Sequence, residues 1–198
     1  MVLPSLLGEG RCRRQMGEAK KYNMANNDKL EQYRQWRKEN DPKTIKMLNS
    51  TLMFKLFLMG RLPMAFLAGT KVRTMDGTTC QIDVPYKWLN QNPFRSTYFA
   101  VLSMAAEMST GMLAMMMTNG SKPSVSMLVT HLEADFVKKA TGITTFTCDE
   151  GKQFNEVIER AITTGEAQSY TATAVGKSKD GEIEATFKVE WSFKMRSK

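Results

Sequence analysis

Residues 96–119 read STYFAVLSMAAEMSTGMLAMMMTN and are apolar on nearly every side of a helix. A helix of this kind is expected to be buried on all sides, at the centre of a core. Glu107 is the only charged residue in it. A buried carboxylate is costly unless it is paired, hydrogen-bonded or protonated, and such groups are frequent in catalytic sites. Glu107 is therefore the first candidate functional residue; the alternative is a structural carboxylate satisfied by backbone donors or an arginine.

The segments around this helix predict an α+β fold. Residues 28–39 form a polar helical stretch, a second helical pattern begins at Asp41-Pro42, and Pro63 bends or restarts it. Downstream of the apolar helix, residues 153–162 are predicted as a short amphipathic helix. Alternating or extended sequence predicts strands in residues 72–84, 124–136, 142–148, 166–177 and 182–194. Strands that accompany one segregated helix indicate an antiparallel sheet wrapped around that helix.

One face of the extended segment at residues 124–136 is expected to carry Leu128, Thr130, Leu132, Ala134 and Phe136. The single histidine, His131, would lie on the other face with Val129 and Glu133. A lone histidine without partners at fixed spacing is not expected to bind a metal or act in catalysis.

The 198 residues are expected to form one domain with an N-terminal extension. Residues 1–23 lack sustained periodicity, and Met24 resembles a natural start, so residues 1–40 are predicted as a leader and polar extension. Within it, residues 1–23 are expected to be disordered, and residues 41–198 form the domain. We find neither a secretory signal nor an uncharged apolar stretch long enough to span a membrane. Three scattered cysteines favour a reducing compartment, and hence the cytoplasm.

A net charge of +8 allows an anionic partner, although a solvated basic surface is the simpler interpretation. Several motifs are absent from the sequence. Gly176-Lys177-Ser178 is not a P-loop, because Thr171 stands where the first glycine is required. We also find no nucleophile elbow, zinc-binding motif or basic, aromatic-studded strand. No nucleic-acid partner, metal or cofactor is therefore expected.

Four stretches resemble the hotdog fold of PaaI-type and 4-hydroxybenzoyl-CoA thioesterases, and especially a little-characterised bacterial branch of that superfamily without assigned function. The stretches are PYKWLNQNPFRS at 85–96, YFA at 98–100, AAEMSTG at 105–111 and FVKKATG at 136–142. The resemblance covers residues 45–195. It implies that the apolar helix is the central helix of the hotdog fold and that the strands wrap around it.

The resemblance also implies a site for thioesters. Related enzymes carry an acidic residue on the central helix, and Glu107 falls in the matching region. They polarise the thioester carbonyl with backbone N–H groups at the start of that helix, here Ser96, Thr97 and Tyr98. Many relatives have His-Gly-Gly there, whereas this chain has Arg95-Ser96-Thr97, so the glycines that allow close approach to the backbone are missing.

Glu107 would act as general base or as nucleophile. Its stripe on the helix carries small residues, including Ser103 and Gly111, which leave room for a ligand or for close packing. Ser96 and Glu107 lie about 16 Å apart along a helix, so one carbonyl cannot contact both. The catalytic hypothesis therefore implies a homodimer, or a dimer of dimers, with sites shared across its interface.

Other candidates have simpler alternatives. Asn92 would position water or substrate, or it belongs to a turn before Pro93. Arg95, Lys138 and Lys139 would meet the phosphates of coenzyme A, or they are solvated. The methionines of the central helix would line a pocket for varied acyl chains, or they fill the core.

We therefore expect hydrolysis of an acyl-CoA or acyl-carrier thioester, with coenzyme A present only as part of the substrate. The alternative is a non-catalytic acyl or fatty-acid binding protein on the same fold. A third hypothesis, in which residues 43–68 anchor the chain to a lipid surface, ranks below these, so a membrane partner is not expected.

Overall fold

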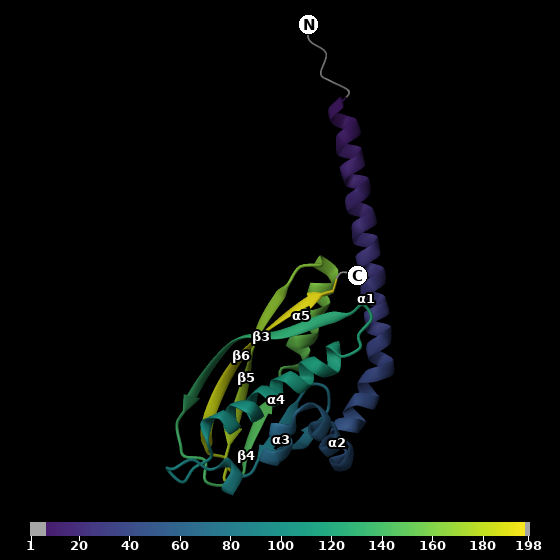
Figure 1. The fold of residues 1–198 in the computed structure, drawn as a ribbon. Helices are drawn as coiled ribbons and strands as arrows, with labels where there is room; N and C mark the ends of the chain where they lie inside the picture. Colours follow the sequence, from purple (N-terminus) through teal and green to yellow (C-terminus); the bar gives the residue numbers. More distant parts are fainter. Residues whose placement is uncertain (1–6, 197–198) are drawn as a thin grey trace.

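The computed structural model describes the backbone of residues 7–196, and side chains from residue 26 onward together with that of Met24. A long helix, α1 (Leu7–Asn49), extends beyond a domain in which a sheet curves around a central helix (Figure 1).

Helix α1 differs from its prediction. It runs without a break through Asp41-Pro42, where a new helix was expected. Tyr33 and Leu48 lie on either side of Pro42 and are both buried, so packing against the domain holds the two segments in one helix. The backbone of residues 7–23 continues the helix, where we expected disorder, and residues 1–6 lie outside the described residues.

The segment before residue 41 is packed against the domain. Asn26 is buried, and its amide donates a hydrogen bond of 2.8 Å to the carbonyl oxygen of Thr163. Helix α1 thus crosses residue 40, where we placed the boundary of the polar extension, in contact with the remainder of the chain.

Two short helices follow α1. Helix α2 (Thr51–Arg61) ends two residues before Pro63, which occupies the first turn of α3 (Pro63–Ala68). The predicted interruption at Pro63 is therefore confirmed. Gly69 ends α3 with a φ of 73°, a left-handed conformation that glycine adopts at low cost.

Six antiparallel strands form one sheet in the order β1-β2-β4-β5-β6-β3. Between β2 and α4 lies a short 3-10 helix, η1 (Trp88–Asn90). The Asp76 carboxylate accepts hydrogen bonds from the N–H groups of Thr78 and Thr79 and so fixes the turn between β1 and β2. The strands are β1 (Lys71–Met75), β2 (Cys80–Val84), β3 (Val125–Phe136), β4 (Thr144–Cys148), β5 (Gln168–Lys177) and β6 (Ile183–Met195).

Helix α4 (Phe99–Thr118) is the predicted central helix, and it lies along the concave face of the sheet (Figure 1). Of the described helices, it alone is long and apolar enough to cross a membrane, but most of it is buried inside the domain, as in a core helix. The buried indole N–H of Trp191 on β6 donates a hydrogen bond of 3.0 Å to the Thr110 hydroxyl and thus joins the sheet to the helix.

Helix α5 (Gly151–Thr164) packs between α1 and the strands β5 and β6. A Cβ added at Gly151 would lie 2.4 Å from the carbonyl oxygen of Gly77, so only glycine allows α5 to start this close to the β1–β2 turn.

Strand β3 contains a register shift between Val129 and His131. Beyond it, Leu132, Ala134 and Phe136 pair with Val189, Phe187 and Ala185, whose side chains are buried. Before it, the exposed Leu128 pairs with Ser192. The prediction that Leu128 and Leu132 share a face is wrong, because a bulge reverses the alternation of a strand.

Candidate functional site

Glu107 lies midway along α4 and is half-buried. Its carboxylate has neither a hydrogen bond nor an ion pair with another described residue. Burial alone shifts its pKa, which is raised above the ordinary value of a glutamate. The structural alternative, a carboxylate satisfied by backbone donors or an arginine, thus finds no partner in the described part of the chain.

The space beside Glu107 depends on Gly111, one turn further along α4. A Cβ at Gly111 would lie 3.1 Å from Oε1 of Glu107 and 3.1 Å from two carbons of the Trp191 ring. Gly111 therefore lets the carboxylate and the indole approach the same part of the helix. Ser103, one turn before Glu107, directs its hydroxyl to the carbonyl oxygen of Phe99.

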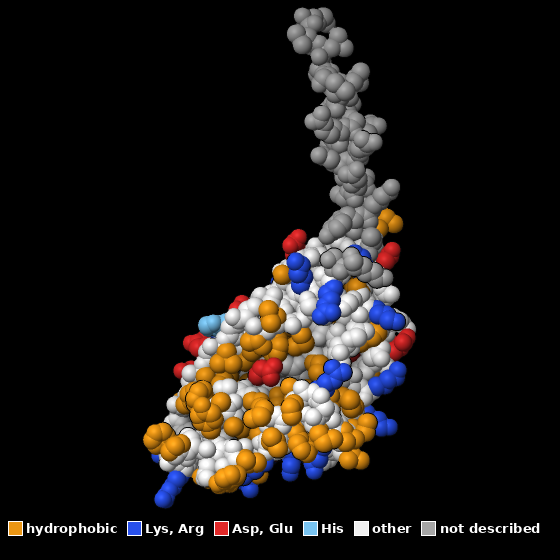
Figure 2. Space-filling model, viewed as in Figure 1, with side chains coloured by type: hydrophobic (Ala, Val, Ile, Leu, Met, Phe, Trp, Pro, Cys, Tyr) orange, Lys and Arg blue, Asp and Glu red, His pale blue; other side chains and the backbone are white. Residues whose placement is uncertain are grey.

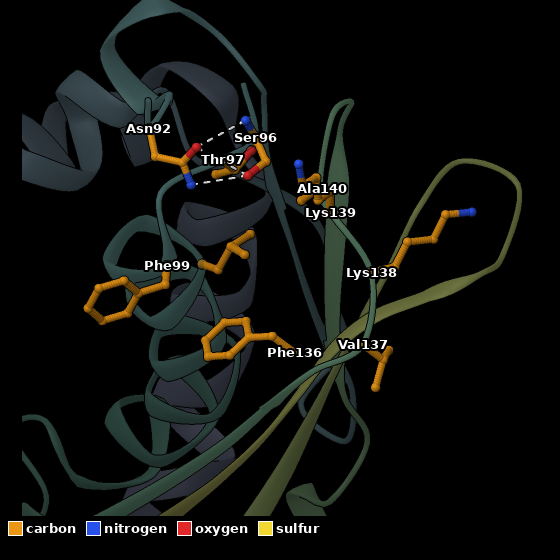
Figure 3. Close-up of a pocket in the computed structure, with 10 residues that line it drawn as sticks. Asn92, Ser96, Thr97, Phe99, Phe136, Val137, Lys138, Lys139 and Ala140 are labelled. Atoms are coloured by element: carbon orange, nitrogen blue, oxygen red, sulfur yellow. Dashed lines mark hydrogen bonds between the residues drawn. The ribbon is translucent and has the colours of Figure 1, made fainter. Parts of the chain in front are cut away.

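A second feature is a pocket of about 350 Å³ at the start of α4 (Figure 3). Its lining combines a polar loop, an apolar wall and two lysines. The lining residues are Asn92, Ser96, Thr97, Phe99, Leu102, Phe136, Val137, Lys138, Lys139 and Ala140. The sequence indicated the polar part of this lining. The apolar wall depends on how the end of β3 meets the start of α4, and the sequence analysis did not identify it.

The loop before α4 is ordered by Asn92. Its Oδ1 accepts hydrogen bonds from the N–H groups of Phe94 and Ser96, and its Nδ2 donates to the Ser96 hydroxyl at 3.0 Å. Arg95 adopts a φ of 58° at this turn, is exposed, and does not line the pocket. The amide of Asn92 is thus engaged in the turn, and its role at the site is to hold Ser96.

The backbone donors at the start of α4 differ from those the sequence suggested. The N–H of Ser96 donates to Asn92 Oδ1, that of Thr97 to the carbonyl oxygen of Ala140, and that of Tyr98 to the carbonyl oxygen of Asn90. These three groups are occupied because the preceding loop is tied to its neighbours. In the first turn of α4, by contrast, the N–H groups of Phe99 and Ala100 meet no described acceptor.

The hydroxyl of Thr97 is a further available polar group. Thr97 is only 4% exposed, lines the pocket, and its Oγ1 has no hydrogen-bond partner among the described residues. Buried hydroxyls are usually hydrogen-bonded, so an open one in a pocket lining is available to a ligand.

The two lysines of the pocket are not equivalent. Lys138 forms an ion pair with Glu182, whereas Lys139 is exposed and has no ion-pair partner in residues 26–196. An anionic group entering the pocket would therefore meet Lys139 as the available cation.

Glu107 is not part of the pocket lining. It lies eight residues beyond Phe99, about 12 Å along the helix. One copy of the chain therefore brings the loop, the helix start and the lysines together, but leaves the candidate catalytic carboxylate apart from them.

Metal binding finds no support in the described residues, where no group of three histidine, cysteine or acidic side chains comes together. His131 pairs with Glu190 in the exposed part of β3. Cys80 and Cys148 face each other across β2 and β4 as buried free thiols, and burial raises the pKa of both.

Solved structures similar to this chain share its architecture. A protein of unknown function from Pseudomonas aeruginosa, described as a probable thioesterase, has a TM-score of 0.64 and 14% identity over 76% of this chain and 99% of its own. A thioesterase from Haemophilus influenzae has a TM-score of 0.55 and 8% identity over 76% of this chain and 97% of its own. A mutant thioesterase from Pseudomonas aeruginosa has a TM-score of 0.56 and 12% identity over 71% of this chain and 91% of its own. The predicted hotdog fold is thereby confirmed.

No curated protein matches the sequence. A family model, described as a domain of unknown function (DUF4442), matches residues 50–192, which is well over half of the chain. The protein therefore belongs to the DUF4442 family and has the hotdog fold of thioesterases.

Proposed function

We propose that this protein hydrolyses the thioester of an acyl-CoA or acyl-carrier substrate, with Glu107 as general base or nucleophile. The observation that carries the proposal is the half-buried, unpaired carboxylate of Glu107 on the central helix of a hotdog fold. Thioesterases are among its structural neighbours, although at identities that indicate the fold alone.

As general base, Glu107 removes a proton from water while the water oxygen attacks the thioester carbonyl. The C–S bond then breaks, the proton passes to the leaving thiolate, and the products are a carboxylic acid and a thiol. As nucleophile, the carboxylate forms a mixed anhydride and releases the thiol, and water hydrolyses the anhydride in a second step. Both routes need the carboxylate in its ionised form.

The negative charge that develops on the carbonyl oxygen needs hydrogen-bond donors. The open N–H groups of Phe99 and Ala100 and the Thr97 hydroxyl support this role, in place of the occupied N–H groups of Ser96, Thr97 and Tyr98. Asn92 acts as a positioning residue through Ser96, and Lys139 lies where a coenzyme A phosphate would approach.

We further propose that the working enzyme is a homodimer. Because Glu107 lies outside the pocket in one copy, each site would combine Glu107 of one copy with the pocket of the other. Strand β3 supplies a free edge for this association, since it ends the sheet and extends over 12 residues. The free thiols of Cys80 and Cys148 support a cytoplasmic location.

The test is thiol release from a panel of acyl-CoAs with short, long and aromatic acyl groups. Release should be lost in Glu107→Gln, which keeps the size of the side chain and removes its charge. The matched control is Glu166→Gln, an exposed position between α5 and β5 and away from β3, which should retain the wild-type rate. Equal rates in the two variants would contradict the role of Glu107.

A second candidate function is acyl binding without hydrolysis. The occupied N–H groups of Ser96, Thr97 and Tyr98 favour it, because a ligand cannot use them without breaking bonds of the loop. In that case no acyl-CoA of the panel releases thiol. Calorimetric titration with the same compounds should then detect binding that is unchanged in Glu107→Gln.

A further inference from the structure

Helix α2 is apolar on two opposite faces. Phe54 and Leu58 face the core and are buried, whereas Leu52, Leu56 and Met59 lie on the outer face and are exposed. The apolar face of a helix is expected to be covered, and α2 has two such faces. No described residue covers this outer face.

Helix α3 and η1 also expose large apolar side chains to solvent. Met64 of α3 is 69% exposed and Trp88 of η1 is 80% exposed. The two segments are tied together, because Asn90 Nδ2 donates to the carbonyl oxygen of Ala68 at 2.8 Å and Lys87 Nζ donates to that of Leu67 at 2.7 Å. We call this the α2–α3 surface; its members are Leu52, Leu56, Met59, Met64, Leu67 and Trp88. Figure 2 shows hydrophobic side chains gathered over α2 and α3.

The charges carried by α2, α3 and the segments that flank them in the sequence are of one sign. Residues 42–75 contain six basic residues and no acidic residue. All six are exposed: Lys43, Lys46, Lys55, Arg61, Lys71 and Arg73. Of these, Arg73 alone forms an ion pair with a described residue, Asp83. Unpaired cations around exposed leucine, methionine and tryptophan side chains are typical of helices that lie in the surface of an anionic membrane.

We propose that the α2–α3 surface binds anionic lipid bilayers, with the outer face of α2 inserted among the acyl chains at the headgroup boundary. Trp88 would lie at headgroup level, where tryptophan is enriched in membrane proteins. Lys55 and Arg61, on the same helix as the inserted side chains, would contact lipid phosphates. This proposal reverses the expectation from the sequence that a membrane is not a partner.

A second copy of the chain is a poorer occupant of this surface. A two-fold interface centred on it would bring its basic residues close to their own equivalents, which is unfavourable. Helix α2 also contacts β1, at the opposite edge of the sheet from β3. Association through β3 would therefore leave the α2–α3 surface free to contact lipid.

A cavity beside the surface suits a lipid. It has a volume of about 520 Å³ and lies between α1, α2 and the end of α4. Met47, Phe57, Leu62 and Met115 supply its apolar lining, and Arg61 also lines it. An acyl chain entering it would have a guanidinium available for its headgroup phosphate.

The experiment is sedimentation of the full chain with vesicles of phosphatidylcholine alone, or mixed in equal parts with phosphatidylglycerol. We expect binding to the anionic vesicles in low salt and release in high salt. Lys55→Glu with Arg61→Glu should weaken the partition coefficient by at least about 30-fold, which is the contribution of the two basic residues that are lost. Lys177→Glu with Lys194→Glu changes the net charge equally on exposed strand positions and should have little effect.

The apolar part is tested by Leu52→Gln, Leu56→Gln and Met59→Gln together, which leave every charge in place. This variant should bind the same vesicles at least about tenfold more weakly, because it loses buried apolar area. Circular dichroism checks that the fold is retained. Equal binding by the wild type, the charge-reversed variant and this variant would overturn the proposal, as would failure of the wild type to bind.

The oligomeric state of the triple glutamine variant distinguishes a lipid bilayer from a second copy of the chain as the partner of this surface. Light scattering without vesicles should give the wild-type mass. A dimer that becomes a monomer in this variant would identify the surface as a subunit interface and overturn the proposal. Because neither assay measures thiol release, their outcome is independent of whether Glu107 is catalytic.

Discussion

At the scale of single residues, the fold maintains a carboxylate in an unfavourable place. Glu107 has no described partner, and burial raises its pKa. Below the pKa of the unfolded chain both states are protonated and the fold bears no penalty. As the pH rises past that value, the unfolded chain ionises more readily than the folded one, so stability falls.

Because stability falls as Glu107 ionises, removal of its charge should stabilise the fold at high pH. Glu107→Gln should unfold at higher urea concentration than the wild type at pH 8, where the buried charge is present. The two proteins should have nearly equal midpoints at pH 4. Urea titrations at both values of pH, with Glu166→Gln as the exposed control, measure the difference. A wild-type protein more stable than Glu107→Gln at pH 8 would indicate that the carboxylate has a favourable partner.

The same shift predicts the pH profile of hydrolysis. Because both routes need ionised Glu107, kcat/KM should fall on the acidic side with a midpoint above the ordinary glutamate pKa. Thiol release measured across pH gives this midpoint. An acidic limb of the kcat/KM profile with its midpoint at or below the ordinary glutamate pKa would indicate that another group controls the profile.

Gly111 gives a third prediction at this scale. Gly111→Ala adds a Cβ that must displace Glu107 or Trp191 by a few tenths of an ångström. We expect kcat to fall by about tenfold or more, since small misplacements of catalytic groups slow reactions strongly. Gly60→Ala in α2 is the control, because its Cβ meets no atom within 4 Å and improves helix propensity equally. Equal activity in both variants would show that Gly111 does not position Glu107.

At the scale of elements, the link between α4 and β6 decides where Glu107 lies. The helix carries Glu107, Thr110 and Gly111, and the hydrogen bond from Trp191 to Thr110 fixes the helix against the sheet. Few other polar contacts are available to a helix with so apolar a surface.

Thr110→Val should therefore destabilise the fold by about 1–3 kcal/mol, because the Trp191 N–H is left buried without an acceptor. Thr110→Ser keeps the hydroxyl and should retain most of the stability. Urea unfolding of both variants measures the difference. A Thr110→Val variant as stable as the wild type would show that the hydrogen bond from Trp191 contributes little to stability.

At the scale of the whole molecule, the free edge of β3 and the separation of Glu107 from the pocket lead to the same expectation of a dimer. Leu132 lies on the inner face of this edge strand and is exposed in the single chain. Leu132→Glu should shift the protein toward monomer, because a two-fold interface would bring the two carboxylates together. Light scattering gives the mass, and thiol release should fall with it.

Leu89→Glu is the control for that variant. It places the same charge on an exposed leucine of η1, away from β3, and should leave the mass unchanged. A monomeric wild-type protein that still hydrolyses thioesters would rule out the shared site.

Several elements could be predicted because their signals lie within short stretches of sequence. The apolar run around Glu107 predicted the central helix, Pro63 predicted the break between α2 and α3, and alternation predicted the strands. Burial of that carboxylate also follows from composition, because a helix without other charges has no solvated face.

Other features could not be predicted, because they depend on contacts between segments that are distant in the sequence. Packing of Tyr33 and Leu48 carries α1 through Pro42, and a bulge places Leu128 and Leu132 on different faces. Hydrogen bonds from residues 90–98 to one another and to Ala140 determine which N–H groups at the helix start are open. Hydrophobic periodicity carries no information about these partners, because each hydrogen bond depends on where a distant segment arrives in space.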